Sequence, residues 1–236
     1  MRTSSSDPLL TDDLGDLLGM FPSDALRGVL ERLGNHRSWS PFSSARATEA
    51  HQAGADADLR PHAAAIAREI IWWGSNDIAA KFKKSPTWRD ILLDLARVSG
   101  FKKGMLPEAA QAWEIEHAIL GRAAADWENL TPEKRREVLE KAGLNPSDYA
   151  KAVGGLVGGT AVRAGVAPAA AMLGLKGVAV TAVSAAIMPV TLALAAAWTG
   201  YVSAGPAYRV LKPVALSIAL TRRQMLDARA AQAFEF

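Results

Sequence analysis

The chain has 236 residues, of which 50% are hydrophobic and 22% are charged, and it contains no cysteine. This apolar fraction excludes an extensively disordered chain, and the lack of cysteine excludes disulfides, thiolate chemistry and cysteine-based zinc sites. The formal net charge of +3 is uneven, because residues 1–148 carry a net −3 and residues 149–236 carry a net +6. Nucleic acid is not an expected partner, because no nucleic-acid-binding motif is present.

The N-terminal part of the chain is predicted to form short amphipathic helices. Asp7-Pro8 is typical of an N-cap followed by proline in the first turn, and leucines then recur at helical spacing. Ser23 begins a second predicted helix that ends at Gly34. We therefore expect residues 1–35 to form a pair of helices.

The next two segments differ in their periodicity. Residues 36–60 show no helical spacing and are expected to form a linker or surface loop. Residues 61–148 return to helical spacing and are predicted to form an amphipathic helical domain. Its first helix is expected to stop at Gly74, with Ser75 as the N-cap of the next one. No segment has the pattern of a strand, so the sequence predicts an all-α, multi-helix bundle.

Further helix starts follow in this domain. Ser85-Pro86 and Thr131-Pro132 each combine a capping residue with a proline. Between them a helix is expected over residues 107–127, with Glu116 as a charged intruder on its apolar face. The tryptophans expected in the core are Trp72, Trp73, Trp88, Trp113 and Trp127.

The segment 149–204 is predicted to form a Gly/Ala-rich hydrophobic helical hairpin. Its second arm lies in a run of 32 residues, from Gly177 to Tyr208, that contains no charge. A bilayer core requires about 20 apolar residues of helix. The run is rich in alanine, which adds little to insertion, so the segment lies near the insertion threshold. Two interpretations stay open: a membrane hairpin, or the buried core of a soluble bundle.

The first arm of this hairpin carries overlapping small-xxx-small pairs, Gly154 with Gly158 and Gly155 with Gly159. This spacing places glycines on one helix face, where another helix can approach closely. Arg163 would line a pore or an interface if the arm inserts, and would lie on the solvated face if it does not. The other expected packing and boundary residues are Lys176, Pro189, Trp198 and Tyr201. The two aromatic residues lie where an interfacial belt is expected.

Residues 205–236 are predicted to form a C-terminal helix. Pro206 suits its first turn, whereas Pro213 is expected to kink or end whatever precedes it. From Val214 the pattern is amphipathic at best. Tyr208 and Arg209 are expected to anchor the end of the hairpin, with Arg209 satisfying helix carbonyls.

Three patches resemble the YaaW-like bacterial family. WWGSNDIAAKF at 72–82 and LTPEKRREVLEKAGL at 130–144 are similar to its middle section and to its acidic-basic helix. The closing signature of the family is matched by Gly205, Pro206, Ala207, Tyr208, Arg209 and Val210. Leu211-Lys212 departs from the family pattern. The family is grouped with the ubiquinol–cytochrome c chaperone domain, so the resemblance implies an all-helical assembly factor working at a membrane.

No catalytic pattern is present. The histidines are His36, His51, His62 and His117. Only His117 has neighbouring carboxylates, at Glu114 and Glu116, and the second histidine of a helical metal site is missing. The glycine-rich segment lacks the Lys-Ser/Thr of a phosphate-binding loop, and no G-x-S-x-G elbow occurs. We therefore expect no enzyme, no metal and no cofactor.

The N-terminus has no secretory pattern, so the expected location is the cytoplasm with association to the inner membrane. The leading hypothesis is a non-enzymatic helical protein whose hairpin engages the bacterial inner membrane, because its basic flanks suit anionic lipid headgroups. Self-association or pore formation would then be controlled by the N-terminal helices. The alternatives are an assembly chaperone or adaptor for a membrane-protein client, and a soluble bundle with the hairpin as its core.

Overall fold

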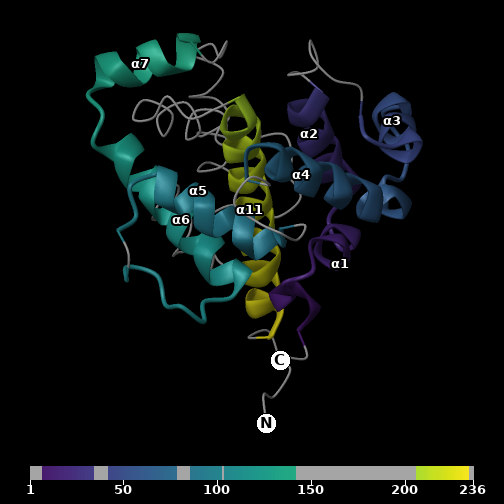
Figure 1. The fold of residues 1–236 in the computed structure, drawn as a ribbon, viewed down its shortest axis with the longest axis horizontal. Helices are drawn as coiled ribbons and strands as arrows, with labels where there is room; N and C mark the ends of the chain where they lie inside the picture. Colours follow the sequence, from purple (N-terminus) through teal and green to yellow (C-terminus); the bar gives the residue numbers. More distant parts are fainter. Residues whose placement is uncertain (1–6, 35–41, 79–85, 103, 142–205, 234–236) are drawn as a thin grey trace. The chain divides into compact units, whose positions relative to one another are not determined.

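The computed structural model describes residues 7–34, 42–78, 86–102, 104–141 and 206–233 (Figure 1). Within these ranges the chain forms helices and no strand, which confirms the all-α prediction. The expected hairpin lies outside the described residues. The chain divides into two compact units, and each is described by itself. The first is Met1–Glu116 with Val202–Ala215, and the second is His117–Tyr201 with Leu216–Phe236.

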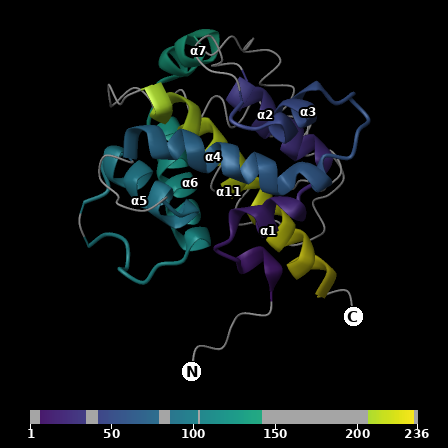
Figure 2. The ribbon, with the colours of Figure 1, turned by 45° about the vertical axis from the view of Figure 1, so that its right-hand side comes forward.

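The first unit is arranged around α4. Its elements are η1 (Pro8–Leu10), α1 (Leu14–Gly19), α2 (Ser23–Gly34), α3 (Ala45–Gln52), η3 (Arg60–His62), α4 (Ala63–Ile78), α5 (Trp88–Val98) and the first parts of α6 (Ala112–Glu128) and α11 (Pro206–Ala233). Helix α4 contacts α1, α2, α3 and α5. Figure 2 shows α4 crossing this unit, with α1 on one side and α2 and α3 on the other. Apolar residues of all these helices are buried, so α4 is the central helix against which the others pack.

Local caps start the N-terminal helices. The carboxylate of Asp7 accepts a hydrogen bond from the backbone N of Leu9 at 2.9 Å, which confirms the predicted cap before Pro8. Asp13 caps α1 in the same manner. Because Asp13 starts a new helix, the single expected helix is two elements, η1 and α1. Ser23 is the first residue of α2, as predicted.

The expected loop over residues 36–60 is wrong for its middle part, which forms α3. Ser44 caps this helix by accepting a hydrogen bond from the backbone N of Ala47 at 3.2 Å. The buried residues of α3 are Ala47 and Ala50. Alanine contributes little to a hydrophobic pattern, so the helix left no clear periodicity in the sequence.

The expected break at Gly74 is also wrong, because α4 continues through it to Ile78. A Cβ atom placed on Gly74 would lie 2.4 Å from Cδ1 of Ile91 on α5. The glycine therefore permits the close approach of α4 and α5 rather than ending the helix. Ser75 is not an N-cap, since its hydroxyl donates to the carbonyl oxygen of Ile71 at 2.8 Å.

The boundaries of α5 and α6 shift from their predicted positions. Helix α5 begins at Trp88 with Thr87 as its N-cap, slightly after the predicted Ser85-Pro86 start. Helix α6 begins at Ala112 rather than at Pro107. Between the two helices, residues 99–102 and 104–111 form an irregular connection.

The tryptophan prediction is confirmed for two residues and wrong for three. Trp88 and Trp127 are buried, whereas Trp72, Trp73 and Trp113 are half-buried. Consecutive helix positions point in different directions, so Trp72 and Trp73 cannot share one core-facing direction. Their rings pack edge to face instead, with centroids 5.7 Å apart.

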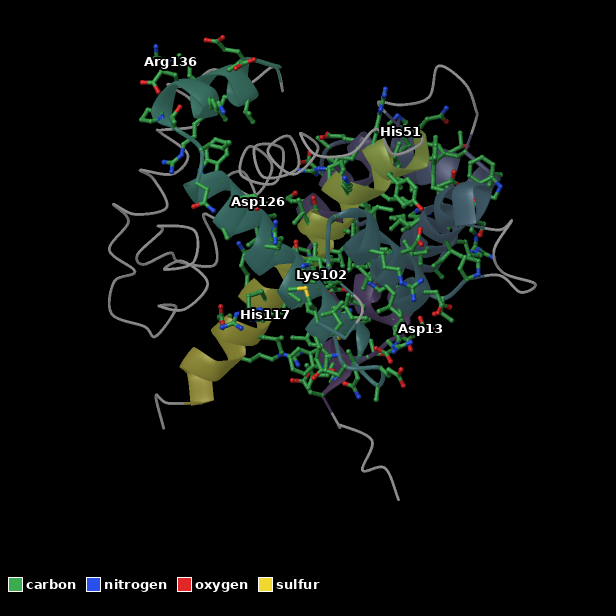
Figure 3. All side chains as sticks on the ribbon, turned by 60° about the vertical axis from the view of Figure 1, so that its left-hand side comes forward. Asp13, His51, Lys102, His117, Asp126 and Arg136 are labelled. Atoms are coloured by element: carbon green, nitrogen blue, oxygen red, sulfur yellow. The ribbon has the colours of Figure 1, made fainter. Side chains whose placement is uncertain are left out.

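The described part of the second unit contains the rest of α6, α7 (Pro132–Lys141) and the rest of α11. Pro132 is the first residue of α7, which confirms the predicted Thr131-Pro132 start. The guanidinium of Arg135 lies 5.7 Å from the ring centroid of Trp127, and its Nε donates to the Trp127 carbonyl at 3.1 Å. These contacts fix the start of α7 to the end of α6. Arg136 is exposed on α7 (Figure 3).

Helix α11 differs from the expected amphipathic tail. Pro206 begins it as predicted, but the helix does not end at Pro213 and runs on to Ala233. Every residue from Val210 to Arg222 is buried. A helix that is apolar on most sides is typical of a buried position. No helix in the described part of the chain is long and apolar enough to cross a membrane.

Candidate functional site

Helix α5 carries two polar side chains that are buried in the first unit. A capping box fixes its start, in which Thr87 Oγ1 accepts from the backbone N of Asp90 and Asp90 Oδ2 accepts from the backbone N of Thr87. Trp88 and Asp94 are only 2% and 4% exposed. The capped helix thus holds an indole N–H and a carboxylate away from solvent.

The first buried contact joins α5 to α6. The indole Nε1 of Trp88 donates a hydrogen bond to Oε1 of Glu116 at 2.7 Å. Glu116 is 2% exposed, although the sequence marks it as a charged intruder on an apolar face. Burying a carboxylate is costly unless it is hydrogen-bonded, and a hydrogen bond to a charged group contributes about 1.5–3 kcal/mol. The Glu116 side chain therefore has a structural role, because its hydrogen bond joins α6 to α5.

The second buried contact joins α5 to α11. The hydroxyl of Tyr208 donates a hydrogen bond to Oδ2 of Asp94, and Tyr208 is itself buried. Arg209 is exposed and Val210 is buried. Tyr208 is the last residue of the charge-free run. The chain that leaves the apolar segment is thus held by the helical core at that run's end.

A buried lysine follows on α11. Lys212 lies one helical turn beyond Tyr208, on the same side of the helix, and is 1% exposed. Burial lowers the pKa of the Lys212 ammonium group, because a low-dielectric interior disfavours its charged form. Lysine is almost never fully buried in proteins. The first turns of α11 therefore bury two polar groups, the hydroxyl of Tyr208 and the ammonium group of Lys212.

Two more ionisable side chains are buried in the first unit. Glu69 on α4 is 1% exposed and accepts hydrogen bonds from the backbone N and the hydroxyl of Ser43 at 2.8 and 2.6 Å. Arg32 on α2 donates to the carbonyl oxygen of Gly28 at 2.6 Å. Burial lowers the pKa of Arg32 to about 10. The Glu69 contact joins α4 to the residues before α3, and the Arg32 contact lies within α2.

The described residues do not assemble a metal centre. Among them, no group of three or more His, Asp or Glu side chains could hold a metal ion. His117 is half-buried on α6 and His51 lies on α3 (Figure 3). The ring of His51 packs against Phe42 with centroids 5.2 Å apart. His36 lies outside the described residues.

The predicted site residues fall into two groups. The hairpin residues outside the described part of the chain are Gly154, Gly155, Gly158, Gly159, Arg163, Lys176, Pro189, Trp198 and Tyr201, and Gly205 joins them. The closing motif is partly described, from Pro206 at the start of α11 to the buried Val210. Within it the structure gives Tyr208 a defined partner.

Sequence reasoning missed Asp94, and it noted Lys212 only as a departure from the family pattern, without predicting its burial. Asp94 falls among the buried Ile91, Leu92 and Leu95 of α5, and an acid in such company could have been questioned, as Glu116 was. Lys212 stands beside Pro213, next to a strongly apolar stretch. Neither residue belongs to a recognisable motif, so only the position of α11 gave them meaning.

Comparisons with protein-family models, with curated proteins and with solved structures give no match for this chain. The YaaW-like resemblance therefore stays a prediction. The function has to be argued from the residues themselves.

Proposed function

We propose that this chain is a non-enzymatic helical protein that brings the hydrophobic segment 149–204 to the bacterial inner membrane. Helix α11 holds the C-terminal end of that segment on the helical scaffold. The observation that carries the proposal is the hydrogen bond from Tyr208 to Asp94, because it ties the last residue of the charge-free run to the core. A segment that enters lipid needs such a fixed point if the scaffold is to control it.

The charge distribution supports the same proposal. Residues 149–236 carry a net +6, and Arg209, the first charge after the apolar run, is exposed. A basic side chain near an anionic membrane surface contributes about 1 kcal/mol. An exposed cation next to the anchored Tyr208 therefore suits a boundary between scaffold and headgroups. Self-association through the Gly154 and Gly158 face would give an oligomer or a pore.

Membrane fractionation tests the proposal with a matched pair of substitutions. Ala186→Asp places a charge inside the charge-free run, whereas Ala45→Asp places the same charge on the exposed surface of α3. A charge at the centre of an inserted helix costs about 2.5–3.5 kcal/mol. We expect the full chain and Ala45→Asp to stay in the membrane pellet through a carbonate wash. Ala186→Asp should move to the supernatant.

Recovery of the unaltered full chain in the soluble fraction without detergent would overturn the proposal. The segment 149–204 would then be a buried core, and an adaptor or chaperone role would take precedence. In that case Ala186→Asp would lower the yield of folded protein instead of changing its fraction.

A further inference from the structure

A pocket of about 630 Å³ lies beside the connection between α5 and α6. All of its lining residues belong to the first unit. Its apolar wall includes Leu93, Phe101 and Leu106, and three cationic side chains line it against a single acid, Glu108. The volume falls within the range of about 300–1,000 Å³ that is typical of small-molecule sites. The pocket is thus large enough for a ligand with an extended apolar part.

One of the three cations holds the wall of the pocket. Arg89 donates from Nε to the carbonyl oxygen of Ala110 at 2.6 Å, and from Nη2 to the carbonyl oxygen of Glu108. Gly100 and Gly104, on the connection between α5 and α6, have φ angles of 88° and 89°. Such angles favour glycine because other residues are strained there. The described part of the connection is therefore held in a defined conformation, and its residues form much of the pocket wall.

The other two cations are available to a ligand. Arg97 and Lys102 line the pocket and are both exposed, and Figure 3 labels Lys102 on the connection after α5. Neither forms an ion pair with any residue that the structure describes. On the same connection Met105 is 58% exposed, the one large apolar side chain so exposed among the described residues.

We propose that this pocket binds a single anionic amphiphile, an apolar chain that ends in a carboxylate or a phosphate. Leu93, Phe101 and Leu106 contact the chain, while Arg97 and Lys102 pair with the anionic head. Arginine in particular matches carboxylate and phosphate oxygens with two parallel hydrogen bonds. The site does not depend on the membrane segment proposed above, because every lining residue lies outside residues 149–204.

Isothermal titration calorimetry on the full chain tests the pocket. The probes are decanoate and dihexanoyl phosphatidylglycerol, each below its critical micelle concentration, with inorganic phosphate as the bare head and decyltrimethylammonium as the reversed charge. The double variant Arg97→Gln/Lys102→Gln removes the free cations of the pocket. Its matched control, Arg46→Gln/Arg136→Gln, removes two exposed cations that do not line the pocket. The hydrophobic segment is common to all variants, so differences between them report on the pocket.

We expect one saturable site for an anionic amphiphile, weakened about tenfold or more in the pocket variant and unchanged in the control. Tighter binding of the phospholipid would identify the natural ligand as a membrane lipid, and tighter binding of decanoate would identify it as a free fatty acid. Equal binding of inorganic phosphate or of the cationic probe would overturn the proposal. So would the absence of a saturable site, or equal affinities in the two double variants.

Discussion

Gly74 gives a sharp test of how α4 and α5 pack. Replacing a glycine in a helix interior by alanine favours the helix by about 0.5–1 kcal/mol. At this position the new Cβ would lie 2.4 Å from Cδ1 and 2.7 Å from Cγ1 of Ile91, which is fully buried. Overpacking of this kind costs about 1–3 kcal/mol. We therefore expect Gly74→Ala to lower the free energy of unfolding by up to about 2.5 kcal/mol, whereas helix propensity alone would raise it.

Urea unfolding followed by far-UV circular dichroism measures this effect. The control is Gly121→Ala on α6, where the added Cβ meets no described atom within 4 Å other than its chain neighbours and its own helix backbone, and it should raise stability by about 0.5–1 kcal/mol. In an Ile91→Val background the clashing Cδ1 is absent, so Gly74→Ala should cost less there. If Gly74→Ala stabilises the protein as much as Gly121→Ala, the close approach of the two helices is wrong.

Three further predictions concern single contacts. Trp88→Phe leaves Glu116 without its indole donor and should lower the free energy of unfolding by about 1–3 kcal/mol. The control Trp113→Phe, at a half-buried site, should change it by less than about 0.5 kcal/mol. Equal effects of the two substitutions would contradict the buried contact. Tyr208→Phe removes the donor to Asp94, and limited proteolysis should then cut α11 sooner than in the unaltered chain; an unchanged cleavage rate would show that the bond does not hold the helix. Hydrogen bonds from Arg60 hold the pKa of Asp58 well below its ordinary value of 3.8. The resulting stability is present above that value and lost as the pH falls below it, so the urea midpoints of the unaltered chain and of Asp58→Asn should converge between about pH 4 and about pH 2; parallel curves would refute the linkage.

The helix starts were predictable where the capping bond lies within a few residues. The Asp7 cap joins neighbours in the sequence, and Pro132 and Pro206 supply a fixed φ angle for a first turn. The continuity of α4 through Gly74 was not predictable, because a glycine in mid-helix is unfavourable by local propensity. Only the approach of Ile91 from another helix shows why the glycine is there.

By itself the sequence determined the all-α class and the starts of η1, α2, α7 and α11, since periodicity and caps act over one or two turns of chain. Only the tertiary structure decided which charges are buried and what they bond to. Trp88 and Glu116 are 28 residues apart and Asp94 and Tyr208 are 114 apart, so no local pattern links them. The pocket beside α5 likewise depends on the hydrogen bonds from Arg89 to the carbonyl oxygens of Glu108 and Ala110. Long-range hydrogen bonds of this kind exist only once the helices have packed.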